Sequence, residues 1–110
     1  MTETTAIILR IAADKASSFE SMFEAEEIPV WDDFTRRGRF LEASLVRVQD
    51  GSEMRKGVQD YILHVVAVDR QAHDEHDSDP RFKAFLEKAQ KLQPSGPLVW
   101  LGEPVFERRA

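Results

Sequence analysis

The sequence predicts an α+β fold in which helices cover one face of a four-stranded antiparallel sheet. Three observations lead to this prediction. The chain has 110 residues, enough for one hydrophobic core and too few for two independent ones. Its segments follow the order β-α-β-β-α-β, and the first and third strand segments are the most apolar, as central strands are. This order is that of a ferredoxin-like domain, and we assign residues 1–110 to a single domain.

The first strand and the first helix precede Pro29. Residues 4–12 form a short Ile-rich run bounded by polar residues, which is typical of a strand buried on both faces. Asp14 is expected to cap the following helix, because its side-chain oxygen can accept from the free amides of the first turn. Along this helix apolar residues recur at three- and four-residue steps, as in a helix packed on one side. Its glutamates are expected to face water: Glu20, Glu24, Glu26 and Glu27.

A second short helical segment lies between Pro29 and Gly38. Proline ends or kinks a helix, because it donates no amide hydrogen and clashes with the preceding turn. The segment VWDDFTRRG places Trp31 and Phe34 on one side and stops at Gly38, a residue suited to a left-handed cap. Residues 40–48 then form the second strand.

The second half of the chain begins with a turn signal at Asp50 and Gly51. Residues 60–68 are rich in β-branched and aromatic side chains without glycine or proline, and they form the third strand. A helix begins near Pro80, because Asp79 before a proline is a strong capping pair. Its apolar residues share one face: Phe82, Phe85, Leu86, Ala89 and Leu92.

The last predicted element is a strand at residues 98–106, after the breaker QPSGP at residues 93–97. Gly102 and Pro104 within it indicate a bulge or an edge position, because proline cannot donate to a central ladder.

The strands carry apolar residues in both alternation phases. Leu9 and Ile8 on the first strand, and Leu63 and Ile62 on the third, point to opposite faces. Right-handed crossovers place both helices on the same side, so they can cover one phase only. The other phase would expose an apolar patch on the order of several hundred Å², more than soluble monomers usually tolerate. We expect a second copy of the chain to cover it, sheet on sheet, about a two-fold axis.

Composition and charge exclude several classes of protein. The formal net charge of −5 disfavours binding to nucleic-acid phosphates. The longest apolar run is too short for a membrane span, and the N-terminal residues lack the basic start of a signal peptide. The chain has no cysteine, so disulfides and thiolate ligands are absent. These features predict a cytoplasmic protein.

The stretch AHDEHDSDPRFKAFL resembles the pattern ALDAHLASPHFQAFL, which is typical of the second helix of antibiotic-biosynthesis-monooxygenase-like proteins in the dimeric α+β barrel superfamily. The residues in register are His76, Ser78, Pro80, Phe82 and Phe85. The resemblance covers the whole chain in topology and about fifteen residues in side chains. It implies a homodimer with a pocket between sheet and helices, and no cofactor.

Two expected positions depart from this family. Its oxygenases often use an asparagine near the first strand and a tryptophan nine residues before the helical histidine. This chain contains no asparagine, and Ala67 occupies the second position. An indole for such a reaction would have to come from Trp31 or Trp100.

The histidines His73 and His76 lie among acidic residues before the predicted helix at Pro80. One reading is electrostatic, because carboxylates favour the positive end of a helix. A second is a metal site, since imidazole and carboxylate suit zinc, manganese or iron, although a third or fourth ligand at fixed spacing is not evident. A third places His76 against a ligand. We predict no metal.

His64 and four aromatic residues complete the candidate site. His64 lies mid-strand, where an imidazole makes one buried hydrogen bond, lines the dimer seam or acts as a base. Large aromatic rings fill the core or form a pocket wall, and the candidates are Trp31, Phe34, Tyr61 and Trp100. Arg10 and Arg47 on strands pair with carboxylates or meet an acidic ligand.

Three functions agree with these features. The first is a homodimer that binds a small apolar or aromatic molecule in the pocket. The second is a cofactor-free monooxygenase or an isomerase for an aromatic or polyketide-like substrate, with His76 or His64 as base. The third is a structural or regulatory dimer whose cavity is filled by its own side chains. Pocket volume separates the third from the other two.

Overall fold

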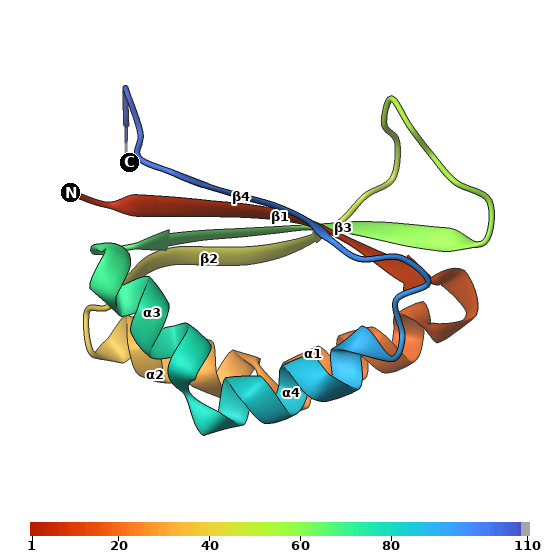
Figure 1. Ribbon diagram of the computed structural model, residues 1–110, viewed down its shortest axis with the longest axis horizontal. Coiled ribbons are helices and arrows are strands. Elements are labelled where there is room, and N and C mark those ends of the chain that lie inside the picture. Colours follow the sequence, from red (N-terminus) through yellow and green to blue (C-terminus); the bar gives the residue numbers. More distant parts are fainter. Residues whose placement is uncertain (109–110) are drawn as a thin grey trace.

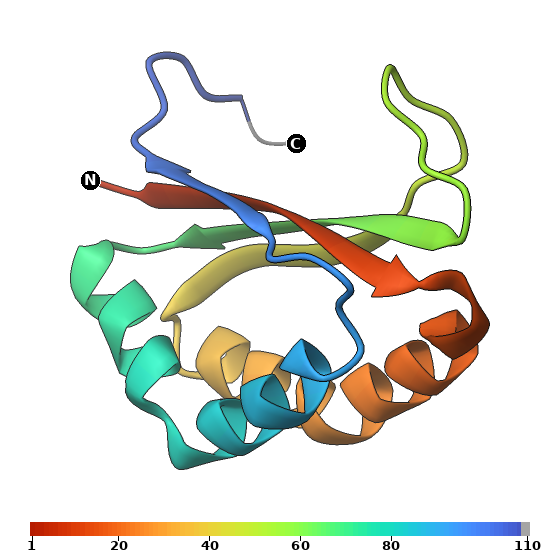
Figure 2. The same ribbon diagram turned by 45° about the vertical axis from the view of Figure 1, so that its right-hand side comes forward.

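The computed structural model of the protein describes residues 1–108, and it has two layers (Figure 1). One antiparallel sheet has the strand order β2-β3-β1-β4. Its strands are β1 Glu3–Ala12, β2 Phe40–Arg47, β3 Val58–Ala67 and β4 Leu98–Gly102. The helices lie on one side of it (Figure 2). They are α1 Ala16–Glu26, α2 Ile28–Arg36, α3 Arg70–Ser78 and α4 Pro80–Gln90, with a 3-10 turn at Ala13–Lys15. The predicted ferredoxin-like fold is confirmed.

The two most apolar strands, β1 and β3, are central and run side by side over their whole length. Their odd-numbered residues face the helices, and Ile11 and Tyr61 are accordingly buried. Even-numbered residues face the opposite side of the sheet, which we call the open face. On it Ala6 pairs with His64 and Trp100.

The core between the layers is rich in aromatic rings. Phe19 lies 5.1 Å from Tyr61 and 5.9 Å from Phe23, measured between ring centroids. Phe85 of α4 meets Phe23 edge-on at 5.4 Å. These rings come from both helix pairs and from β3, so one continuous core holds the layers together.

The helix ends agree with the sequence prediction at Asp79 and Gly38 and differ from it at Asp14. Asp79 accepts from the amide of Arg81 at 2.8 Å, with Pro80 in the first turn of α4, and Gly38 has a positive φ of 72° after α2. Asp14 lies inside the 3-10 turn and α1 has no side-chain cap, so the predicted cap is wrong.

The acidic stretch before Pro80 forms a helix of its own, α3. Asp69 caps it by accepting from the amide of Ala72 at 2.8 Å. The stretch is therefore more than the first turn of α4. Its own N-cap residue precedes it, and the extended backbone of Asp79 separates α3 from α4.

The open face exposes large apolar side chains. Val46, Ile62, Leu98 and Trp100 are between 37% and 58% exposed. The loop at residues 48–57 and the segment at residues 103–108 both rise on this side of the sheet, away from the helices (Figure 1). Strand β4 ends at Gly102, earlier than predicted, and forms an edge as Pro104 indicates. Within residues 1–108 no helix is long and apolar enough to cross a membrane.

Candidate functional site

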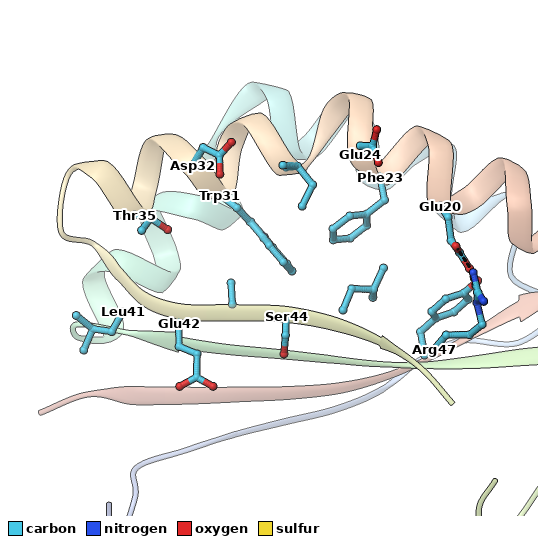
Figure 3. A pocket seen from close by; sticks show the side chains of 14 residues that line it. Glu20, Phe23, Glu24, Trp31, Asp32, Thr35, Leu41, Glu42, Ser44 and Arg47 are labelled. Carbon is cyan, nitrogen blue, oxygen red and sulfur yellow. Dashed lines mark hydrogen bonds and ion pairs between the residues drawn. The ribbon is translucent and has the colours of Figure 1, made fainter. Parts of the chain in front are cut away.

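A cavity of about 760 Å³ lies between the helices α1 and α2 and the strands β2 and β3 (Figure 3). Strand β2 is at the edge of the sheet, so the cavity opens along that edge. Its walls combine apolar, hydroxyl and charged side chains. The lining residues are Glu20, Phe23, Glu24, Ile28, Trp31, Asp32, Thr35, Leu41, Glu42, Ala43, Ser44, Leu45, Arg47 and Tyr61.

The interior of the cavity is apolar and aromatic. Trp31 of α2 and Phe23 of α1 point from the helices toward the sheet (Figure 3). Their ring centroids are 5.0 Å apart and the rings meet edge-on, at 82°. Ala43 and Leu45 share the helix-facing phase of β2 and form the opposite wall. The interior is thus apolar on both the helix side and the sheet side.

One end of the cavity is closed by a polar triad of Tyr61, Glu20 and Arg47. The hydroxyl of Tyr61 donates to Oε2 of Glu20 at 2.5 Å. Arg47 donates through Nε to Oε2 at 2.8 Å and through Nη2 to Oε1 at 2.5 Å. The triad links α1 to β2 and β3, and it confirms the pairing of Arg47 with a carboxylate.

The triad fixes the protonation states of its members. Hydrogen bonds from Arg47 and then from Tyr61 hold the pKa of Glu20 below its usual range. Burial, together with the carboxylate of Glu20, raises the pKa of Tyr61 to about 12. At neutral pH the triad is therefore an ion pair with a neutral phenol.

A second polar cluster, partly buried, lies between α3, β1 and the junction of α1 with α2. Nε2 of His76 lies 2.7 Å from Oε2 of Glu27, and Nδ1 lies 3.2 Å from Oδ1 of Asp77. His73 shares Asp77 at 2.9 Å through Nε2, and its Nδ1 approaches Oε1 of Glu3 at 3.3 Å. Acid and imidazole groups alternate along this chain of contacts, which we call the histidine network.

Glu27 is 1% exposed, so the prediction that it faces water is wrong. Its Oε1 has no hydrogen-bond partner in the part of the chain that the structure describes. The carboxylate is held in the core by His76. Burial alone would lower the pKa of His76, but hydrogen bonds to Asp77 and Glu27 outweigh burial and raise it to about 9.

Aromatic rings enclose the imidazole of His76. The rings of Phe34, Phe40 and Phe82 lie between 4.3 and 5.6 Å from it, measured between centroids. Neither His76 nor Glu27 lines the cavity. The histidine network thus joins the helices to the sheet beside the cavity and is separate from its walls.

The candidate residues fall into three places. Trp31 and Tyr61 line the cavity. Phe34 packs against His76 in the core. His64 and Trp100 lie on the open face, where Nδ1 of His64 is 3.7 Å from Oε1 of Glu42.

Sequence reasoning did not include Glu20 and Arg47 among the candidate site residues. Arg47 follows Ala43 and Leu45 in the phase of β2 that faces the helices. A charged side chain in a covered phase needs a partner, and this signal could have marked Arg47 as a site residue, although not Glu20 as its partner. Within residues 1–108 no group of three or more histidines and carboxylates has the arrangement of a metal site.

Three solved structures illustrate the similarity of this fold to those of known proteins. Rv0793 from Mycobacterium tuberculosis has a TM-score of 0.77 and 19% identity, over 99% of this chain and 100% of that one. An antibiotic biosynthesis monooxygenase has a TM-score of 0.72 and 16% identity, over 96% and 99%. SnoaB, a cofactor-independent oxygenase from Streptomyces nogalater, has a TM-score of 0.69 and 19% identity, over 96% and 95%.

No family model and no curated protein matches the sequence. The likeness is therefore one of architecture, and it extends over almost the whole of each chain. The chain has the ferredoxin-like α+β fold of the antibiotic-biosynthesis-monooxygenase-like proteins.

Proposed function

We propose that the protein is a homodimer that binds a small apolar or aromatic molecule in the cavity between α1, α2 and β2. The observation that carries this proposal is the cavity itself. Its volume of about 760 Å³ lies within the range of about 300–1,000 Å³ that is usual for small-molecule sites. Trp31 and Tyr61 supply aromatic surface and a polar end, as such sites require.

The open face supports the homodimer. Its exposed apolar side chains come from β2, β3 and β4: Val46, Ile62, Leu98 and Trp100. A second copy can cover them by packing sheet on sheet, which places the two cavities on the outer sides of the pair. Since the chain has no cysteine, we expect the dimer to act in the cytoplasm.

A titration with an uncharged aromatic probe, 2-naphthylmethanol, tests the binding function by isothermal calorimetry. Ala43→Phe fills the cavity from β2 and should abolish binding, whereas Ala84→Phe on the exposed side of α4 should leave it unchanged. Circular dichroism confirms that both variants fold, and Ala43→Leu is the milder replacement if the first does not. Equal binding by all variants, or no binding by the native protein, would reject the cavity as a site.

A second candidate function is a cofactor-independent oxygenase, the activity named for SnoaB. The proposed bases, His76 and His64, are not among the lining residues, and both ring nitrogens of His76 contact carboxylates. Turnover of an aromatic substrate with a bell-shaped pH profile, lost in His76→Ala or His64→Ala, would establish this alternative. Binding without turnover favours the simpler function.

A further inference from the structure

The side chains that line the cavity carry a net negative charge. Its lining contains four carboxylates and one guanidinium: Glu20, Glu24, Asp32, Glu42 and Arg47. Arg47 gives two hydrogen bonds to Glu20, so its charge is compensated within the wall. The other charged groups of the lining are all negative.

Two of these carboxylates lie at the rim on the helix side. Glu24 and Asp32 project from α1 and α2 above the apolar interior, whereas Glu42 points toward the open face (Figure 3). Both rim groups are exposed, and within residues 1–108 neither side chain forms an ion pair or a hydrogen bond. Charges of one sign beside a concave apolar wall focus their field at the mouth and concentrate ligands of the opposite sign.

The polar end of the cavity gives no compensating attraction for an anion. The bidentate geometry that Arg47 would offer to a ligand carboxylate is already used by Glu20. The hydroxyl of Tyr61 also donates to Glu20. A carboxylate inside the cavity would therefore approach Glu20 without a free pair of donors.

The aromatic wall also favours a positively charged ligand. Trp31 lines the cavity beside the rim residue Asp32. The face of an indole attracts cations through its quadrupole, more strongly than other aromatic rings do. The rim carboxylates and the indole of Trp31 therefore both favour a positively charged ligand.

We infer that the cavity selects a flat apolar molecule that carries a protonated amine, and that it discriminates against the corresponding carboxylate. This inference rests on the proposed binding function. The apolar body lies between Phe23 and Leu45, and the ammonium group stays at the open mouth near Asp32.

Three probes with one ring system test the charge preference: 2-naphthylmethylammonium, 2-naphthylmethanol and 2-naphthoate. Calorimetry at low ionic strength should give an affinity for the amine about tenfold above that for the carboxylate, with the alcohol between them. The ratio should fall as salt is added, because exposed charges are screened over about 10 Å at 0.1 M.

A pair of double variants separates the rim from the net charge. Glu24→Gln with Asp32→Asn removes both rim carboxylates, and the ratio of amine to carboxylate affinity should fall severalfold. Glu53→Gln with Glu87→Gln changes the net charge equally at residues outside the cavity lining, and it should leave the ratio unchanged.

The possible outcomes are distinct. A carboxylate affinity equal to or above that of the amine, or an equal loss of the ratio in both double variants, overturns the charge preference and leaves the binding site intact. Absence of binding by all three probes rejects the proposed function itself.

Discussion

Nε2 of His76 lies 2.7 Å from Oε2 of Glu27, in an ion pair whose carboxylate is 1% exposed. The two residues are 49 positions apart in the chain, and their contact fixes α3 to the junction of α1 with α2. A buried ion pair contributes little net stability when intact, but the loss of one partner leaves an uncompensated charge in the core.

Replacement of His76 by phenylalanine should therefore destabilise the protein strongly. The ring fits among Phe34, Phe40 and Phe82, while Glu27 loses its partner. We expect a loss of about 3–5 kcal/mol in the free energy of unfolding, measured by urea denaturation.

The double variant His76→Phe with Glu27→Leu should regain most of this loss, because no charge is then buried. Glu26→Gln is the matched control, since Glu26 forms a surface pair with Lys88 worth about 1 kcal/mol or less. A small effect of His76→Phe alone would contradict the assigned role.

Stability should fall as the pH rises from near neutrality. His76 binds its proton more tightly in the folded chain, where its pKa is about 9, than at the ordinary value of 6.5. Its contribution is thus complete below pH 6.5 and is lost as the pH rises to about 9. The loss amounts to about 3 kcal/mol for a shift of this size.

His73 acts in the same direction, because its hydrogen bond with Asp77 raises its pKa against the opposing effect of burial. Urea denaturation at several pH values measures the combined loss. In the double variant His76→Phe with Glu27→Leu, which removes both partners, the dependence should be much weaker. A native protein whose stability is constant over this range would disprove the charged state of the histidine network.

Tyr61 is the one tyrosine of the chain, so ultraviolet absorbance of the phenolate reports on it directly. We expect its midpoint at about pH 12, because burial and Glu20 disfavour ionisation. Glu20→Gln should move the midpoint toward the ordinary value of 10.0, and Glu24→Gln on the same helix should not. A midpoint near 10.0 in native protein, with unchanged circular dichroism, would argue against the triad.

Substitution on the open face should separate the proposed dimer. Trp100→Asp places a charge where Ala6 and its neighbours are expected to meet a second copy. Sedimentation equilibrium should show a monomer, while Ala84→Asp on the helix side should leave the dimer intact. Native protein that stays folded and monomeric at micromolar concentration would refute the pairing mode.

Local patterns were sufficient for the sheet and insufficient for the site. The central position of β1 and β3 and the cap at Asp79 follow from residues that are neighbours in sequence. The burial of Glu27 depends on His76 in a distant helix, and a surface-like spacing of glutamates gives no sign of it. Arg47 was recognised as a residue that needs a partner, but only the fold brings it to Glu20.

Tyr61 and Ile62 are adjacent in β3, yet one lines the cavity and the other lies on the open face. The proposed binding site and the proposed dimer interface thus use alternate positions of the same strand. Under these two proposals, substitutions at odd positions of β3 would change the ligand and leave the dimer intact, and substitutions at even positions would do the reverse. A slip of one residue in the pairing of β3 would exchange the two roles at once.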